Sequence, residues 1–120
     1  MVVNVNPGNT VRVGFTLTNT GSPVSGVSPN QHYITVLFVN TARTDNFVGD
    51  VFSGAMNTGQ AKALSKDLLV PLDLIPDTYN LEIDVYDPNN VNIASAVVAG
   101  SIAVAGIYSA TITGITVTKV

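Results

Sequence analysis

The chain has 120 residues, which is enough for one domain with a sizeable core and too few for two ordinary domains, so we expect a single domain over residues 1–120. Only 11% of the residues are charged and the net charge is −3, which provides no basic surface for a phosphate backbone. We therefore expect no nucleic-acid partner, and because the chain has no cysteine, disulfides and zinc-thiolate sites are excluded.

Alternation of apolar and polar residues predicts the first strands. Residues 3–5 form a short strand, and after a Pro7-Gly8 turn residues 10–19 form a longer one. In this second strand, every other side chain is apolar and is expected to face the core: Val11, Val13, Phe15 and Leu17.

The middle of the chain predicts a central strand, an edge strand and one ambiguous segment. Residues 33–39 are apolar on both faces apart from Thr35, which is typical of a strand covered on both sides, and residues 47–52 suit a sandwich edge. Residues 61–72 also fit a helical turn or two. We favour a strand there, because Pro71 opposes a helix and four apolar residues recur at period two: Leu64, Leu68, Val70 and Leu72.

The last third of the chain predicts a hairpin and further strands. Residues 79–86 place Tyr79, Leu81, Ile83 and Val85 on an inner face, and the turn at 87–90 returns the chain through residues 91–97. Residues 101–105 and 107–120 are expected to add one or two strands. The pattern as a whole predicts an all-β fold, a two-sheet antiparallel sandwich of seven to eight strands.

Two short stretches share the pattern of a known class of module. They are Pro7-Gly8 before a strand that ends in Thr18-Asn19-Thr20-Gly21, and Pro76-Asp77-Thr78-Tyr79-Asn80-Leu81 followed by Val85-Tyr86-Asp87. About half of the chain thereby resembles the immunoglobulin-like modules of bacterial and archaeal surface proteins, such as the cell-adhesion-related and NPCBM-associated types. The resemblance implies an immunoglobulin-like sandwich in which Tyr79 is a tyrosine corner, its hydroxyl bonded to upstream backbone. Asp77 departs from the glycine usual in such modules, and the tail beyond Val98 is longer than the pattern needs.

The sequence shows no catalytic, cofactor or metal-binding motif, so we expect no enzyme and no cofactor. The single histidine, His32, lies between a loop and a strand and is expected at the surface. Aspartate and asparagine are common in turns, and we prefer that interpretation of residues 87–90. The first alternative there is a calcium ion held by Asp87, Asn89 and Asn90, since calcium prefers oxygen ligands in loops.

Charge is nearly absent from both ends of the chain. Arg12 is the only charged residue up to Ala42, and Lys119 the only one from Val91 onwards. Because exposed sheet edges usually carry charge or proline, uncharged terminal strands indicate edges that are covered, either within the same sandwich or by another molecule. The polar residues among positions 91–120 argue against a membrane span. We expect the last segment to be an assembly strand with its apolar positions at Ile107, Ala110, Ile112, Ile115 and Val117.

Two functions are favoured over a third, an accessory domain of an enzyme. The first is a non-enzymatic structural or assembly module, a subunit of a virion, a pilus-like filament or a surface layer, which associates with itself or with another protein through edge strands. The second is an extracellular adhesion or ligand-binding module that recognises a glycan or a protein through loops such as residues 22–30 and 53–60. Both place the protein outside the cell, at a cell surface or in a virion.

Overall fold

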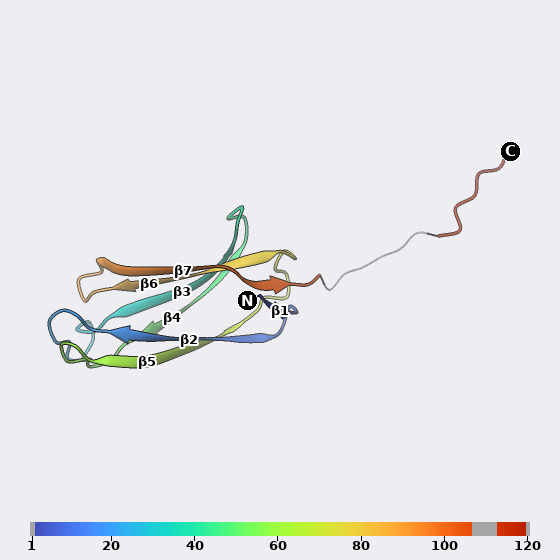
Figure 1. Ribbon diagram of the computed structural model, residues 1–120. Helices are drawn as coiled ribbons and strands as arrows, with labels where there is room; N and C mark the ends of the chain where they lie inside the picture. Colours follow the sequence, from blue (N-terminus) through green and yellow to red (C-terminus); the bar gives the residue numbers. More distant parts are fainter. Residues whose placement is uncertain (1, 107–112, 120) are drawn as a thin grey trace.

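The structure is a computed structural model that describes residues 2–106 and 113–119, and within these ranges it holds seven strands in two sheets and no helix (Figure 1). The strands are β1 (Val3–Val5), β2 (Thr10–Thr18), β3 (Tyr33–Asn40), β4 (Asn46–Phe52), β5 (Ala61–Leu69), β6 (Thr78–Tyr86) and β7 (Asn92–Val104). One sheet has the order β1-β7-β6-β3-β4 and the other pairs β2 with β5. The prediction of an all-β fold is confirmed. No described residue belongs to a helix long and apolar enough to cross a membrane.

The first strand departs from the expected antiparallel pattern. β1 runs parallel to β7, with Val3 opposite Ile102 and Val5 opposite Val104. The turn after β1 explains the difference: Gly8 has a φ of +88° and donates its N–H to the carbonyl of Val70, so the chain crosses to the other sheet before β2 begins. The prediction of a wholly antiparallel sandwich is therefore wrong at this pair.

The ambiguous segment is a strand. β5 pairs antiparallel with β2 over its whole length, from Thr18 opposite Ala61 to Thr10 opposite Leu69. The helical alternative is excluded, but Leu72 lies beyond the strand and is exposed, not on the inner face as expected. Pro71 lacks an N–H to continue the ladder, which accounts for the early end.

The strand expected at the centre of a sheet, β3, is an interior strand of the larger sheet and is covered on one face only. β3 pairs with β4 and with β6, and Ile34, Val36 and Phe38 are buried. Tyr33, Thr35 and Leu37 point to the other face and are partly exposed. The expected cover on both faces is wrong, because the second sheet packs against one face of the larger sheet and the other face is turned to solvent.

The end of the chain contains one long strand where two were expected. β7 continues from Asn92 to Val104, and the irregularity in its pairing with β6 lies near Gly100, which has a φ of +60°. In the tail, residues 107–112 lie outside the described residues, and residues 113–119 form no strand and are exposed. The expected strand is therefore not present in residues 113–119.

Candidate functional site

One long side of the sandwich, between β2 and β7, is not closed by any described strand. β2 pairs with β5 alone, and β1 covers the outer edge of β7 only at Ile102–Val104. The remainder of that edge, which includes Asn92 to Ala99 and ends at the bend near Gly100, has no neighbour among the described strands. We call this side, bounded by the free edges of β2 and β7, the open side (Figure 1).

The open side is hollowed by two apolar depressions. One, of about 320 Å³, lies between β2 and the first part of β7, and a second, of about 450 Å³, lies between β2 and β1. Arg12 also lines the depression beside β1. The apolar side chains that line the two depressions come from both sheets: Val3, Val5, Val11, Val13, Phe15, Leu17, Phe38, Leu81, Ile83, Val85, Ala94, Ala96 and Ile102. Because Phe15, Leu81 and Ile83 are only partly buried, this face of the core is incompletely covered.

The free edge of β7 lacks the devices that normally protect an edge strand. Residues 92–99 include no charged residue and no proline, and the bend of the strand comes after them, at Gly100. Val97 is 66% exposed, and Ile93 and Val98 are about half exposed. An edge that is long, uncharged and apolar invites pairing with another strand.

The two predicted assembly residues that the structure describes do not lie at this edge. Ile115 and Val117 are 76% and 94% exposed. They belong to residues 113–119, the red segment drawn apart from the sheets in Figure 1. Ile107, Ala110 and Ile112 lie outside the described residues. The residues that line the open side of β7, Ala94 and Ala96, were not anticipated from the sequence, and alternating small residues in an uncharged strand were the available signal.

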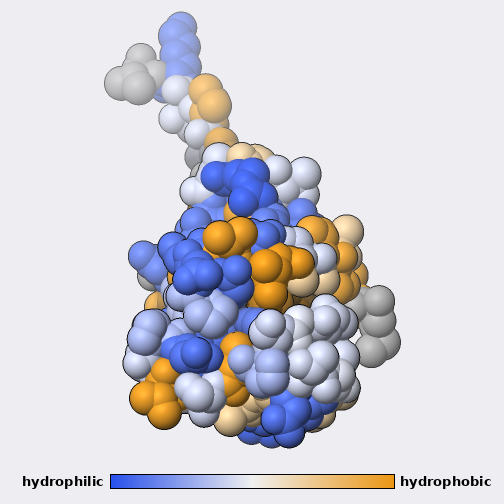
Figure 2. Space-filling view, turned by 90° about the vertical axis from the view of Figure 1, so that its left-hand side faces the viewer, coloured by the Kyte–Doolittle hydropathy of each residue, from blue (hydrophilic) through white to orange (hydrophobic). Residues whose placement is uncertain are grey.

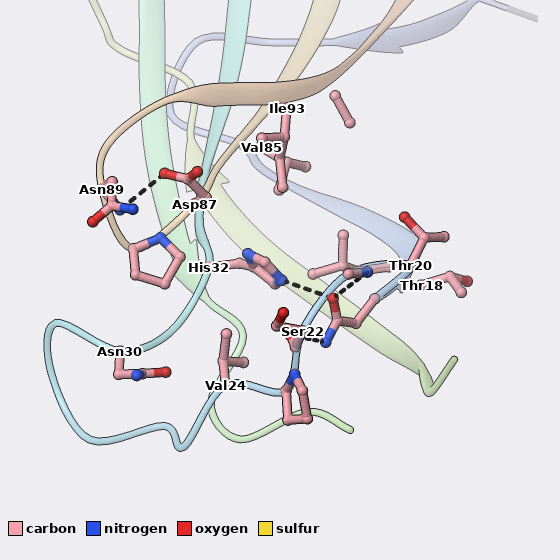
Figure 3. A pocket seen from close by; sticks show the side chains of 16 residues that line it. Thr18, Thr20, Ser22, Val24, Asn30, His32, Val85, Asp87, Asn89 and Ile93 are labelled. Atoms are coloured by element: carbon pink, nitrogen blue, oxygen red, sulfur yellow. Dashed lines mark hydrogen bonds between the residues drawn. The ribbon is translucent and has the colours of Figure 1, made fainter. Parts of the chain in front are cut away.

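A third hollow, separate from the two depressions of the open side, lies at the loop end of the sandwich. It has a volume of about 640 Å³ and is lined by the turn after β2, by His32 and by the β6–β7 turn (Figure 3). Figure 2 looks onto this end and shows small apolar patches separated by polar side chains. The mixed lining suits a polar ligand more than an apolar chain.

Asn19 and His32 form the inner wall of this loop-end cleft. The Asn19 amide donates to the carbonyl of Ser22 (2.9 Å), and its oxygen accepts from the Gly21 N–H (3.1 Å) and lies 3.4 Å from His32 Nε2. His32 is 6% exposed, and its Nδ1 has no hydrogen-bond partner in the part of the chain described. The expected surface position of His32 is therefore wrong, because the turn after β2 folds over the ring.

The predicted calcium ligands close a turn. Asp87 Oδ1 accepts from the N–H groups of Asn89 and Val91, both at 2.9 Å, and Asn90 has a φ of +64°. This is the hydrogen bonding of an Asx turn, which accounts for the residue types without an ion. Among the described residues, no cluster of three or more acidic or histidine side chains is placed to hold a metal.

Tyr79 lies at the start of β6 and is fully buried. Its hydroxyl donates to the carbonyl of Ile75, four residues upstream, at 2.6 Å. Burial, followed by the negative charges of Asp45 and Asp77, raises the pKa of Tyr79 to about 12. The phenol therefore stays protonated, and remains a donor, over the whole physiological range.

No protein-family model matches the chain, and no curated protein was found to be similar to it. The open side and the loop-end cleft are therefore the two features from which function can be inferred.

Proposed function

We propose that the protein is a non-enzymatic structural or assembly module whose subunits associate by strand addition at the open side, in a virion, a filament or a surface layer. The observation that carries the proposal is the uncovered and uncharged edge of β7 between Asn92 and Ala99. Such an edge presents a row of unpaired N–H and C=O groups, and an added strand gains affinity through main-chain hydrogen bonds.

We also propose that the architecture is immunoglobulin-like. The order β7-β6-β3-β4 facing β2-β5 agrees with strands G-F-C-C′ facing B-E in variable-type immunoglobulin domains. The hydroxyl of Tyr79, at the start of the strand equivalent to F, bonds to upstream backbone as in a tyrosine corner. We propose on this basis that the chain is a module of the surface-protein type and acts outside the cell or in a virion.

A second function is favoured by one observation, the loop-end cleft of about 640 Å³. Thr18, Asn30 and Asn89 supply polar groups around an apolar floor that includes Leu17 and Val85, a combination suited to a glycan or another polar ligand. A full-length chain that stays monomeric and binds an oligosaccharide, with binding lost on Asn30→Ala, would favour this function over assembly.

The assembly proposal is tested by light scattering on a sizing column, over a wide range of concentrations. We expect the full chain to form a defined oligomer or a filament. A variant with two lysines on the open edge, Ala94→Lys and Ala96→Lys, is expected to be a folded monomer, because the added ammonium groups would have to be desolvated by an incoming strand.

The matched control places the same two charges on the opposite edge of the same sheet. Asn46 and Val48 are exposed on β4, so Asn46→Lys with Val48→Lys should assemble like the unaltered chain. A chain that is monomeric at every concentration, or two variants that behave alike, would overturn the proposal.

A further inference from the structure

The described part of the tail has the pattern of an isolated strand. In residues 113–119, Ile115 and Val117 alternate with Thr116 and Thr118, and Lys119 is the only charged residue. β-Branched residues at period two favour an extended strand with one apolar face. In this structure the segment makes no strand, and each of its residues is exposed. It thus has an apolar face with nothing packed against it.

We infer that residues 113–118 of one copy insert into the open side of a second copy, as an added strand beside the free edge of β7. This inference rests on the proposed assembly function and names the partner segment. Ile115 and Val117 would fill the depression between β2 and the first part of β7, against Phe15 and Ile83, and the threonines would face solvent. The exchange completes the core face that each sandwich leaves partly covered.

The dimensions of donor and acceptor agree. At about 3.3 Å per residue, the free edge from Asn92 to Ala99 is about 23 Å long, and an extended segment 113–119 spans about 20 Å. The polarity of the two surfaces also agrees, since neither the segment before Lys119 nor residues 92–99 contain a charged side chain. Lys119 lies on the same face as Ile115 and Val117, so the inserted part ends before it, and insertion of residues 113–118 buries no unpaired charge.

A neighbouring copy is a better source of the strand than the same chain. A tight hairpin within one chain would place the residues after Ala105 beside Ile102–Val104, directly before the exit from the sandwich. β1 already occupies that position, and Ala105 also donates its N–H to the carbonyl of Val5 at 3.1 Å. A tail from another copy meets no such obstacle. Because each copy then offers one donor and one acceptor, assembly is head to tail and produces a ring or a filament.

The experiment mixes two full-length variants that are each disabled on one side. Ile115→Asp with Val117→Asp places charge on the apolar face of the donor segment, and Ala94→Glu with Ala96→Glu blocks the acceptor with charge of the same sign, so that the two blocked sides also repel each other. Each variant alone should be monomeric in light scattering. Mixed together, they should form a dimer of one copy of each and no larger species, because the acceptor-blocked chain still has a donor segment and the donor-blocked chain still has a groove.

The control is Thr116→Asp with Thr118→Asp, which adds the same charge to the other face of the segment and should still assemble. If the donor-blocked variant assembles like the unaltered chain, two β7 edges pair directly: the inference is then wrong and the assembly function stands. If the acceptor-blocked variant assembles while the donor-blocked one does not, tails pair with tails. That result overturns the inference and also the proposed assembly through the open side. The unaltered chain could also be monomeric, with an unfolding midpoint that is lowered by the double substitution Ile115→Asp with Val117→Asp. That result would indicate insertion of the tail within one chain, and it would overturn the inference and the assembly function.

Discussion

Tyr79 connects the turn before β6 to the core of the sandwich. Its ring packs within the main apolar cluster, and its centroid lies 6.3 Å from that of Phe47. Its hydroxyl satisfies the Ile75 carbonyl, and the Ile75 N–H in turn donates to Asp45 Oδ2 at 2.9 Å. The residue therefore fixes where β6 enters the larger sheet.

Replacement of Tyr79 by phenylalanine should remove this hydrogen bond without opening a cavity. We expect Tyr79→Phe to lower the free energy of unfolding by about 1 kcal/mol, the usual net contribution of a buried hydrogen bond. Urea unfolding followed by circular dichroism measures the loss. An unchanged midpoint would mean that water or another donor replaces the hydroxyl at Ile75.

The same substitution should change how stability depends on pH. The pKa of Tyr79 is about 12 in the folded chain and 10 for an ordinary tyrosine, so its contribution is complete below pH 10. Between pH 10 and 12 the folded chain holds the proton more tightly than the unfolded chain does. Stability therefore falls as pH rises, by at most about 1.4 kcal/mol per pH unit. Urea unfolding at several pH values should show a shallower decline in Tyr79→Phe than in the unaltered chain, and identical slopes would contradict the shifted pKa.

Tyr79 and His32 illustrate what residue patterns reveal. Tyr79 was assigned to the core because it begins an alternating strand, and its partner four residues upstream is local in sequence. His32 was placed at the surface because its neighbours in sequence are loop residues. Its burial depends on Asn19, a residue distant in the chain, and no local pattern reports such a contact.

At the scale of elements, the alternating strands were predictable and their neighbours were not. In residues 10–19 and 79–86, apolar residues at every second position identify the buried face. The hairpin from β6 to β7 follows from its Asp-Pro-Asn-Asn turn. The parallel pairing of β1 with β7 joins the two ends of the chain. Only the three-dimensional arrangement shows that β1 stops after three pairs and leaves residues 92–99 uncovered. For the same reason, the absence of charge at the two ends of the chain predicted a strand edge that is covered by another strand or another molecule, but it did not show which edge that is.

The loops at the cleft end are joined by a close backbone approach at Gly26. A Cβ atom added there would lie 2.5 Å from the Ala55 nitrogen, and Gly26 has a φ of +81°. Gly26→Ala should therefore cost about 2–4 kcal/mol, from backbone strain together with overlap. The measurement is the free energy of unfolding in urea.

Gly59→Ala separates the cost of backbone strain from the cost of overlap with the added Cβ atom. Gly59 has the same φ of +81°, but an added Cβ would meet nothing within 4 Å. We expect a loss of about 1 kcal/mol there, from the left-handed backbone alone. Equal losses at the two glycines would show that the loop at Gly26 moves away to accept the methyl group.

At the scale of the whole molecule, the open side, the uncharged ends and the alternating tail have one common consequence. Each sandwich has a core face that its own described strands leave partly exposed, and a segment suited to cover the same face in a neighbour. Exposed apolar surface of this kind normally marks an interaction site in a soluble protein. Head-to-tail association through strands would then be driven by main-chain hydrogen bonds and apolar burial, with little contribution from charge.

This driving force predicts an unusual response to salt. Raising sodium chloride from about 0.01 M to about 1 M shortens the Debye length from about 30 Å to about 3 Å, which weakens assemblies held by exposed ion pairs. Neither residues 92–99 nor the tail before Lys119 carries a charge, so the association constant measured by analytical ultracentrifugation should change little over this range. Sodium sulfate, which strengthens apolar burial, should increase it. Association that collapses with sodium chloride would instead implicate the exposed Arg12–Asp67 pair on β2 and β5, and would move the interface from the β7 edge to that sheet.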